Sequence, residues 1–223
     1  MSTGLVIAVD GPAASGKGTV ASRLAAHYGL PYLDTGLLYR AVGVELLRSR
    51  QDLDDAAAAA AAARALDLDA LEDPALRGAV AGEAASRTAR HPQVRAALLE
   101  LQRAFAARTP GAVLDGRDIG TVIAPDARAK LYVTATPEVR ARRRWLQLTG
   151  QGENAAFQTV LADIRRRDAR DAGRDAAPMT PAPDAVLLDT TDLDIEAATD
   201  AARRIVEAAR AEAHRRQTLP GGG

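Results

Sequence analysis

The chain has 223 residues, of which 47% are hydrophobic and 26% are charged, a balance typical of folded globular proteins. Its 29 basic and 29 acidic residues cancel, so the overall charge offers no attraction for nucleic acid or an anionic membrane, and we expect neither as a partner. Cysteine is absent, which excludes disulfides, thiolate metal sites and cysteine nucleophiles. No apolar run approaches the roughly 18 residues of a membrane helix, and the start lacks the basic region of a secretion signal. We therefore expect a cytoplasmic protein.

Strands and helices are predicted to alternate along most of the chain. In chain order, the hydrophobic patterns predict a strand at 5–10, a helix at 17–27, a strand at 31–34, helices at 35–48, 52–64 and 92–107, strands at 112–115 and 130–134, helices at 137–148 and 157–170, a strand at 185–189 and a helix at 195–214. Such alternation is typical of βαβ units. The sequence therefore predicts an α/β fold, with a mostly parallel sheet and helices on both faces.

Two stretches do not match the sheet-and-helix pattern and are interpreted as inserted lobes of a single domain, 1–214. They cover approximately residues 46–95 and 150–183. The first contains eight consecutive alanines, 56–63, for which we expect a surface helix, and a segment without clear periodicity at 67–89. The tail, 215–223, ends in Gly-Gly-Gly and is expected to be disordered.

A glycine-rich loop after the first strand predicts phosphate binding. It lies between a strand and a helix, the context that a P-loop requires, so its backbone N–H groups are expected to hold the phosphates of ATP. The loop residues are Gly11, Pro12, Ala13, Ala14, Ser15, Gly16, Lys17, Gly18 and Thr19. The alternative is a plain glycine-rich connector.

Lysine usage supports the P-loop interpretation. Of the 29 basic residues only Lys17 and Lys130 are lysines, and Lys17 stands where a compact charge has to reach the β- and γ-phosphates. Lys130 starts a strand, and we expect it to be solvated. Gly18 departs from the usual pattern, because a P-loop lysine is normally followed by the Ser or Thr that binds Mg²⁺. We still expect Mg²⁺ with ATP, but no cluster of metal-ligating side chains.

Several separated motifs resemble those of the bacterial cytidylate kinases. Besides the P-loop, they are Asp34-Thr35-Gly36 with Tyr39-Arg40, Pro92–Arg95, Asp115–Thr121, the arginine-rich segment 164–174 and Leu187–Thr191. The resemblance covers about residues 5–210. It implies a P-loop kinase that transfers the γ-phosphoryl group of ATP to CMP, and to dCMP as well. It also implies that 46–95 is an acceptor-binding lobe and that 150–183 is a lid. We expect a monomer, because no long apolar seam is left over.

The resemblance also implies roles for individual residues. The acceptor nucleotide would be bound by Thr35, Arg40, Ser86, Arg95, Asp118, Asp171 and Arg174, with Ser86, Arg95 and Asp118 reading the cytosine edge. The alternatives are that Thr35 is only a helix N-cap, that Ser86 is a surface serine, that Asp118 only caps a loop and that the arginine-rich segment is a solvated helix face.

Catalysis in this family is implied to depend on charge neutralisation by Lys17, Arg117 and Arg167. Arg143 or Arg144 would lie on the adenine of ATP. No general base is expected, because the second pKa of a phosphate monoester is about 6 and the acceptor is already largely dianionic.

Two other functions stay open on the sequence alone. One is a different small-molecule P-loop kinase, acting on adenylate, uridylate, shikimate or gluconate. The other is a nucleotide-switched binding module without transfer, which would have no use for a second nucleotide site.

Overall fold

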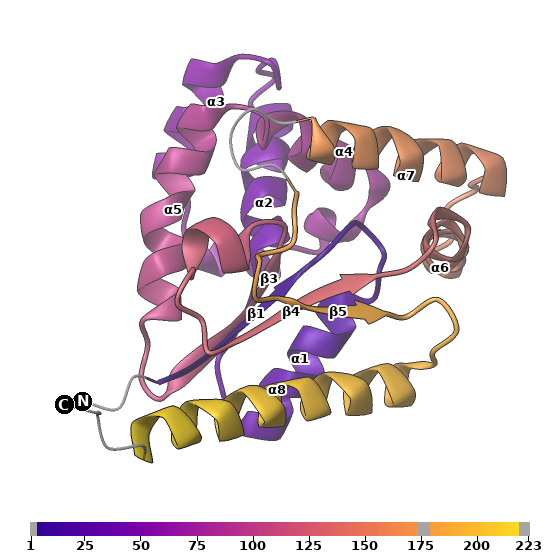
Figure 1. Cartoon of the computed structure of the whole chain (residues 1–223). Coiled ribbons are helices and arrows are strands. Elements are labelled where there is room, and N and C mark those ends of the chain that lie inside the picture. Colours follow the sequence, from indigo (N-terminus) through magenta and orange to yellow (C-terminus); the bar gives the residue numbers. More distant parts are fainter. Residues whose placement is uncertain (1–3, 174–178, 219–223) are drawn as a thin grey trace. The chain divides into compact units, whose positions relative to one another are not determined.

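The computed structural model describes residues 4–173 and 179–218, whose contacts form two compact units (Figure 1). Unit 1 consists of Met1–Leu33, Phe105–Ala135 and Thr180–Gly223, as far as these are described. Unit 2 consists of Asp34–Ala104 and Thr136–Met179. The predicted lobe 46–95 and most of the predicted lid 150–183 therefore belong to one unit.

Unit 1 is built around a five-stranded sheet with the order β2-β3-β1-β4-β5. The strands are β1 (Leu5–Asp10), β2 (Tyr32–Asp34), β3 (Gly111–Gly116), β4 (Ala129–Thr134) and β5 (Val186–Asp189). The pairs β1–β3, β1–β4 and β4–β5 are parallel, and Val9 lies opposite Asp115. Because parallel strands end at the same edge, the segments that follow β1 and β3 are brought together.

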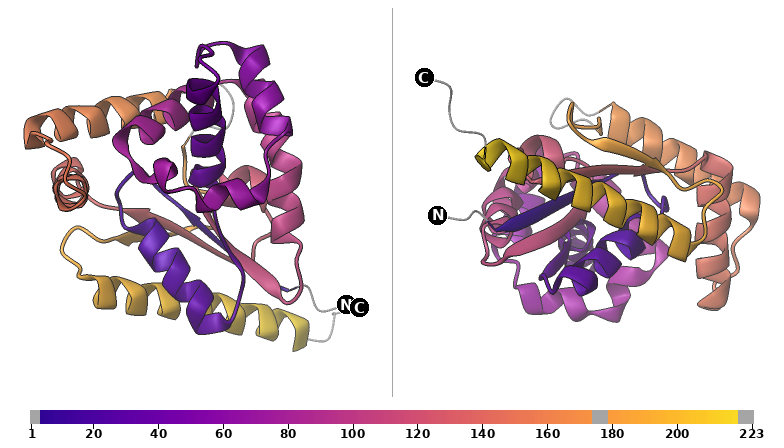
Figure 2. Two further views of the ribbon diagram at one scale, coloured as in Figure 1. Left: turned by 180° about the vertical axis from the view of Figure 1, so that it is seen from behind. Right: turned by 60° about the horizontal axis from the view of Figure 1, so that its bottom comes forward.

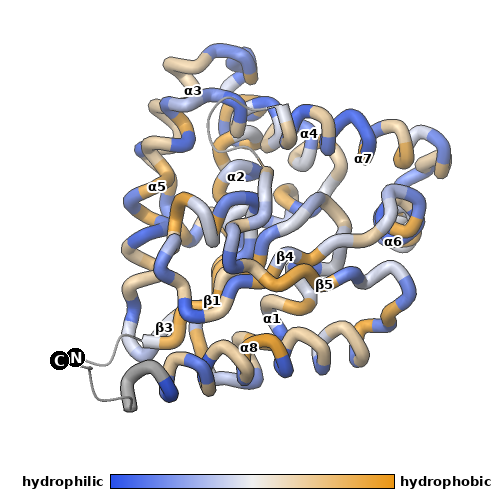
Figure 3. The backbone as a smooth tube through the Cα atoms, in the orientation of Figure 1, coloured by the Kyte–Doolittle hydropathy of each residue, from blue (hydrophilic) through white to orange (hydrophobic). Residues whose placement is uncertain are grey.

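Two helices cover one face of this sheet and close its core. Figure 2 shows α1 (Lys17–Tyr28) and α8 (Ile195–Thr218) running beside each other along the sheet. Apolar residues at helical spacing, such as Val20 and Leu24 in α1 and Ala202 and Val206 in α8, pack on Ile7, Val9, Val113, Leu131 and Val133. The strands carry the most continuous hydrophobic colouring in Figure 3, as expected of buried parallel strands.

Unit 2 is helical. Its elements are α2 (Thr35–Arg48), α3 (Ala56–Arg64), the 3₁₀ helices η1 (Leu68–Glu72) and η2 (Pro74–Arg77), α4 (Ala79–Thr88), most of α5 (Pro92–Ala106), α6 (Pro137–Gly150) and α7 (Phe157–Ala172). Helix α4 packs closely on α2 at Gly43, where an added Cβ would lie 2.6 Å from the Ala84 Cβ. Two small residues at this crossing let the helix backbones approach.

The predicted α/β fold with its parallel sheet is confirmed, and most predicted elements are present within two or three residues. The unassigned segment 67–89 forms η1, η2 and α4. The alanine-rich surface helix is present as α3, but it begins at Ala56 after the Asp55 cap, and it buries Ala59, Ala60 and Ala63. Alanine fits there because it fills little space against a neighbouring helix.

Two expectations are wrong. Lys130 is not solvated: its side chain is 8% exposed, and its Nζ lies 2.9 and 2.8 Å from the two carboxylate oxygens of Asp184. The last helix, α8, does not end at residue 214 as predicted. It continues to Thr218 through residues with good helix propensity. The rest of the predicted tail, 219–223, lies outside the described residues. Within the described ranges, every helix is too short or too polar to cross a bilayer.

Candidate active site

The loop after β1 has the backbone geometry of a phosphate cradle. Gly11 has a φ of 146°, and a Cβ there would lie 2.0 Å from the Val133 carbonyl oxygen, so only glycine fits. Gly16 (φ 89°) and Ala14 (φ 59°) also lie in the left-handed region. The loop therefore turns sharply into α1 at Lys17, and presents the N-terminal N–H groups of that helix at its mouth.

Thr190, which directly follows β5, holds this loop in place. Its hydroxyl lies 2.9 Å from the carbonyl oxygen of Ser15 and 3.0 Å from that of Thr134, and its N–H donates to the same Thr134 oxygen at 2.8 Å. Ser15 and Thr190 are both buried. The segment Leu187–Thr191, which had no assigned role in the sequence, thus supports the P-loop.

Asp10 connects the P-loop strand to the loop after β3. Its two carboxylate oxygens accept hydrogen bonds from the N–H groups of Ile119 and Gly120, each at 2.8 Å. Burial raises the pKa of Asp10 from 3.8 to about 6, although these two hydrogen bonds lower it. Since Arg117 and Asp118 directly precede the bound amides, Asp10 sets the position of both.

We expect the Asp10→Asn substitution to change how stability depends on pH. A carboxyl group whose pKa is higher in the folded state stabilises that state below pH 3.8, and this contribution is lost as the pH rises through about 6. The shift corresponds to about 3 kcal/mol in total. Denaturant unfolding at pH 4.5 and pH 7.5 should therefore show wild type gaining stability, relative to Asp10→Asn, at the lower pH. A difference that is the same at both pH values would contradict the raised pKa.

The carboxylate of Asp115 accounts for the unusual Gly18. Asp115 is buried at the end of β3, and its Oδ2 accepts a hydrogen bond from the Tyr32 hydroxyl at 3.0 Å. The same oxygen would lie 3.0 Å from a Cβ at position 18, so a Ser or Thr side chain would crowd it. An oxygen ligand suited to Mg²⁺ is thus present beside the P-loop, supplied by β3 in place of the residue after Lys17.

Arg117 and Asp118 follow β3 in unit 1. Arg117 is half-buried, and its guanidinium donates to the Gly116 carbonyl oxygen at 3.3 Å. Asp118 is 5% exposed, and its side chain makes no capping hydrogen bond to the turn η3 (Ile119–Ile123) that follows. The interpretation of Asp118 as a loop cap is therefore wrong, because Asp10 occupies the amides that it would cap.

Thr35 and Arg40 lie in the first two turns of helix α2 in unit 2. The N-cap of this helix is Asp34, which accepts from the Gly36 N–H at 2.9 Å, so Thr35 is not the cap. Thr35 is the first helical residue, and it is buried. Arg40 donates to the carbonyl oxygens of Leu76 and Gly78, which holds its guanidinium over η2.

Ser86 and Arg95 both lie in unit 2, on helices α4 and α5 respectively. Ser86 is 2% exposed, which rules out the surface serine, and its Oγ has no hydrogen-bond partner among the described residues. A buried hydroxyl without a partner is costly, and is explained most simply by a ligand that is not part of the chain. Arg95 lies over the ring of Tyr39, with 5.7 Å from its Cζ to the ring centre. Tyr39 therefore orients this guanidinium.

Arg40 and Arg167 converge beside Gly82. A Cβ at this position would lie 3.5 Å from Nη2 of Arg40 and 3.7 Å from Nη1 of Arg167. The two guanidinium groups come from α2 and α7, and the absence of a side chain on α4 leaves room for both. Positive groups gathered around one point favour an anion there.

The arginine-rich helix α7 is only partly the solvated face that its composition suggests. Asp171 is 1% exposed, and Arg167 and Arg170 are half-buried, whereas Arg165 and Arg166 are exposed. The helix ends at Ala172. Arg174 lies outside the described residues.

Arg143 and Arg144 are neighbours on α6, and both are half-buried. Arg144 donates to the Gln147 side chain at 2.8 Å, and burial lowers its pKa. The same helix is joined to α7 by a buried bidentate ion pair between Arg140 and Asp168.

Sequence reasoning missed Asp10, Asp115, Tyr39 and Thr190. Asp10 and Asp115 lie at the ends of the neighbouring strands β1 and β3. Once this strand order is known, their position at the carboxyl edge of the sheet indicates that they belong to the site. Tyr39 and Thr190 lie in motifs that carry the resemblance, but their roles were not predictable because their partners are distant in sequence.

Comparisons with known proteins agree with these features. A family model described as "Cytidylate kinase" matches residues 7–210. Curated relatives carrying that name include proteins from Caulobacter vibrioides (72% identical over 93% of this chain and 98% of the relative) and Xanthobacter autotrophicus (65% identical over 93% and 99%). A crystal structure of an uncharacterized protein from Eubacterium ventriosum aligns with a TM-score of 0.51 at 15% identity, over 92% of this chain and 99% of that one. This last likeness concerns the fold alone. The predicted resemblance is confirmed by the first two results: the chain belongs to the cytidylate kinase family.

Proposed function

We propose that this member of the cytidylate kinase family transfers the γ-phosphoryl group of ATP to CMP, and also to dCMP, giving ADP and CDP or dCDP. One observation carries the assignment of the site. Four polar residues that the resemblance assigns to the acceptor nucleotide are more than nine-tenths buried, although they are widely separated in sequence: Thr35, Ser86, Asp118 and Asp171. Burying polar groups is costly, and the Ser86 hydroxyl has no hydrogen-bond partner among the described residues, which supports a polar ligand at that position.

In this proposal the P-loop of unit 1 binds the phosphates of ATP. The loop Gly11–Thr19 holds the phosphates, and Lys17 lies at the β- and γ-phosphates as a compact charge. Arg143 or Arg144 stacks on the adenine. Arg117 and Arg167 neutralise charge on the transferring phosphoryl group.

CMP is bound mainly by helices of unit 2. Arg40 and the N-terminal region of α2 at Thr35 suit the phosphate, and Asp171 suits ribose hydroxyls. Arg174 is assigned to the acceptor phosphate from the family motif alone. Ser86, Arg95 and Asp118 read the cytosine edge: the first two donate to ring acceptors, and the carboxylate accepts from the 4-amino group.

The residues of the chain also fit Mg²⁺. Asp115 holds a carboxylate beside Gly18, so we propose that it would help to hold the ion together with the phosphates of ATP. When bound, Mg²⁺ neutralises phosphate charge.

The chemistry required of the chain is positioning and charge neutralisation. The acceptor phosphate is already largely dianionic at neutral pH, so its nucleophilic oxygen needs no deprotonation. No residue is therefore assigned as a general base. Lys17 and the arginines then act on the charge that spreads over the three equatorial oxygens in the transition state.

The test is ADP production with CMP, dCMP, UMP, AMP and GMP as acceptors. We expect CMP and dCMP to be used at rates far above the other three. Equal or better use of AMP or UMP would point to another nucleoside monophosphate kinase. Absence of transfer to any acceptor, with ATP bound, would favour the binding module. The monomeric state and the cytoplasmic location stay predictions from the sequence.

A further inference from the structure

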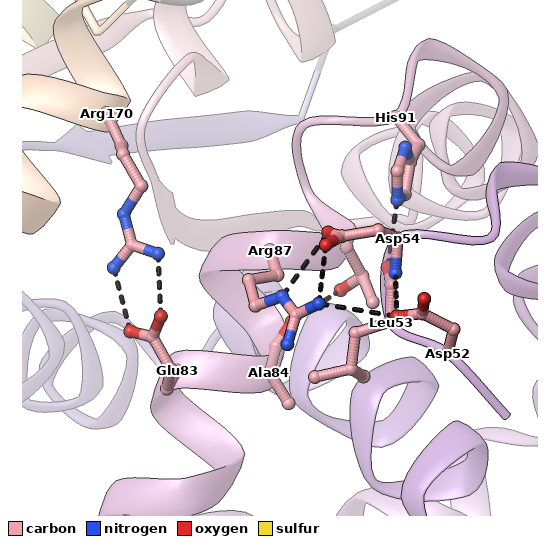
Figure 4. Close-up of polar contacts among 9 residues, drawn as sticks. Asp52, Leu53, Asp54, Glu83, Ala84, Arg87, His91 and Arg170 are labelled. Carbon is pink, nitrogen blue, oxygen red and sulfur yellow. Dashed lines mark hydrogen bonds and ion pairs between the residues drawn. The ribbon is translucent and has the colours of Figure 1, made fainter. Parts of the chain in front are cut away.

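Helix α4 carries two charged residues, Glu83 and Arg87, in addition to the buried Ser86. Its middle turns present Gly82, Glu83, Ser86 and Arg87, and each of the two charged residues forms ion pairs with a segment far away in sequence (Figure 4). The helix is ten residues long and buries six of them. Its position therefore decides where the hydroxyl of Ser86 lies.

Glu83 forms a bidentate ion pair with Arg170 of α7. The two guanidinium nitrogens Nη1 and Nη2 donate to the two carboxylate oxygens at 2.7 Å each (Figure 4). The side chains are 46% and 20% exposed, so the pair is partly shielded from solvent. The hydrogen bond from Arg170 also holds the pKa of Glu83 below its ordinary value. Parallel hydrogen bonds of this kind fix direction as well as distance.

The neighbouring turns of both helices hold groups assigned to the acceptor nucleotide or to the transferring phosphoryl group. Ser86 lies three residues after Glu83 on α4, and Arg167 lies three residues before Arg170 on α7. Residues three apart share one face of a helix, so each partner of the ion pair shares a face with one of these groups. Asp171 directly follows Arg170. A shift of α7 along α4 would change the spacing between the group that faces the base and the groups that face ribose and phosphate.

The other end of α4 is tied to the loop before α3. Arg87 contacts the carboxylates of Asp54 and Asp52, with Nη2 at 2.5 Å from Asp54 Oδ2 and 3.3 Å from Asp52 Oδ1 (Figure 4). His91 adds a contact of 2.9 Å to the carbonyl oxygen of Leu53. These contacts hold the end of α4 in place, and the Glu83–Arg170 pair aligns α7 with it.

We propose that Glu83 and Arg170 are positioning residues for the acceptor nucleotide, keeping Ser86 of α4 and Arg167 and Asp171 of α7 at the spacing that one nucleoside monophosphate requires. This inference rests on the proposed function, and it adds two residues that do not themselves touch the substrate. It assigns them to acceptor affinity and not to ATP binding.

The test compares Glu83→Gln, Arg170→Gln and the double variant with wild type in steady-state kinetics. Each single variant is expected to raise KM for CMP by about tenfold and to lower kcat as well, because Arg167 also acts on the transferring phosphoryl group, with KM for ATP changed by less than about threefold. The double variant should be no worse than either single one, because both remove the same interaction. The charge-swapped variant Glu83→Arg/Arg170→Glu should recover part of the lost affinity.

A long-range charge effect predicts a different pattern. Removing the negative charge of Glu83 would strengthen attraction for the CMP phosphate, and removing the positive charge of Arg170 would weaken it, so the two KM values would move in opposite directions. Positioning predicts that both rise. Opposite signs, or an unchanged KM for CMP in Glu83→Gln, would overturn the proposal.

A matched control is the exposed pair of Arg165 and Glu138, which joins α7 to α6 at 2.7 Å without involving α4. Glu138→Gln should leave both KM values unchanged, and an equal rise in KM for CMP there would also overturn the proposal. CMP affinity measured by the fluorescence of Trp145, the single tryptophan, gives a readout independent of turnover. A wild type that does not phosphorylate CMP would refute the proposed function itself, which separates the two failures.

Discussion

Replacement of Lys17 by alanine is expected to lower kcat for CMP phosphorylation by at least about a hundredfold while leaving the fold intact. The side chain stands at the first position of α1, directly after a loop whose backbone is fixed by Gly11, Gly16 and Thr190. Its charge adds little to the packing of unit 1. It acts on phosphate charge that grows in the transition state, so the loss should appear in kcat more than in KM.

Lys17→Arg should fail as well, because a planar guanidinium does not replace a compact ammonium group in a narrow loop. The matched control is the other lysine of the chain. Lys130→Met removes a buried charge paired with Asp184, whose own side chain is 64% exposed and can be hydrated. That variant should have a lower melting temperature and near-normal kcat. Near-normal turnover in folded Lys17→Ala would refute the P-loop assignment.

The contrast between these two lysines shows what local sequence determines. The P-loop was predictable because a strand, a glycine-rich turn and a helix follow one another directly. The burial of Lys130 was not, because its partner Asp184 lies 54 residues away and the register that places the lysine opposite Ala8 is a property of the whole sheet.

The same reasoning explains why the cap alternatives at Thr35 and Asp118 stayed open in the sequence. Both residues stand where a helix or loop cap is possible, but the hydrogen bonds to the helix amides are made by other residues. Asp34 caps α2 from the preceding position, and Asp10 binds the amides after Asp118 from 109 residues away. A polar residue before a helix predicts a cap only when no neighbouring carboxylate reaches the same N–H groups.

Helix α4 was the least predictable part of the site. Most of its residues are small, and Gly82 argues locally against a helix. Its position depends instead on contacts with α2 at Gly43 and on the pair with Arg170, which is 87 residues from Glu83. The burial of Ser86 follows from that placement, so sequence alone left the surface alternative open.

Replacement of Asp118 by asparagine is expected to reduce the preference for CMP over UMP. Cytosine has an amino donor at its 4-position and uracil has a carbonyl acceptor there, so a carboxylate accepts from the first and repels the second. A buried group left without its partner costs roughly 1–3 kcal/mol, or about tenfold to a hundredfold in discrimination. Asparagine keeps the shape and offers an N–H to the uracil carbonyl. Activity on CMP should therefore fall, and the ratio of kcat/KM for CMP to that for UMP should fall by about tenfold or more.

The stability of the same variant separates base recognition from a structural role. The side chain of Asp118 caps nothing in η3, so Asp118→Asn should change the melting temperature little, whereas a loop cap predicts lost stability with an unchanged CMP-to-UMP ratio. Asp126 is a matched control, because it is an exposed aspartate of the same unit, and Asp126→Asn should change neither quantity. A folded Asp118→Asn enzyme that keeps the wild-type ratio would remove Asp118 from the cytosine site, and would leave Ser86 and Arg95 to account for the choice of base.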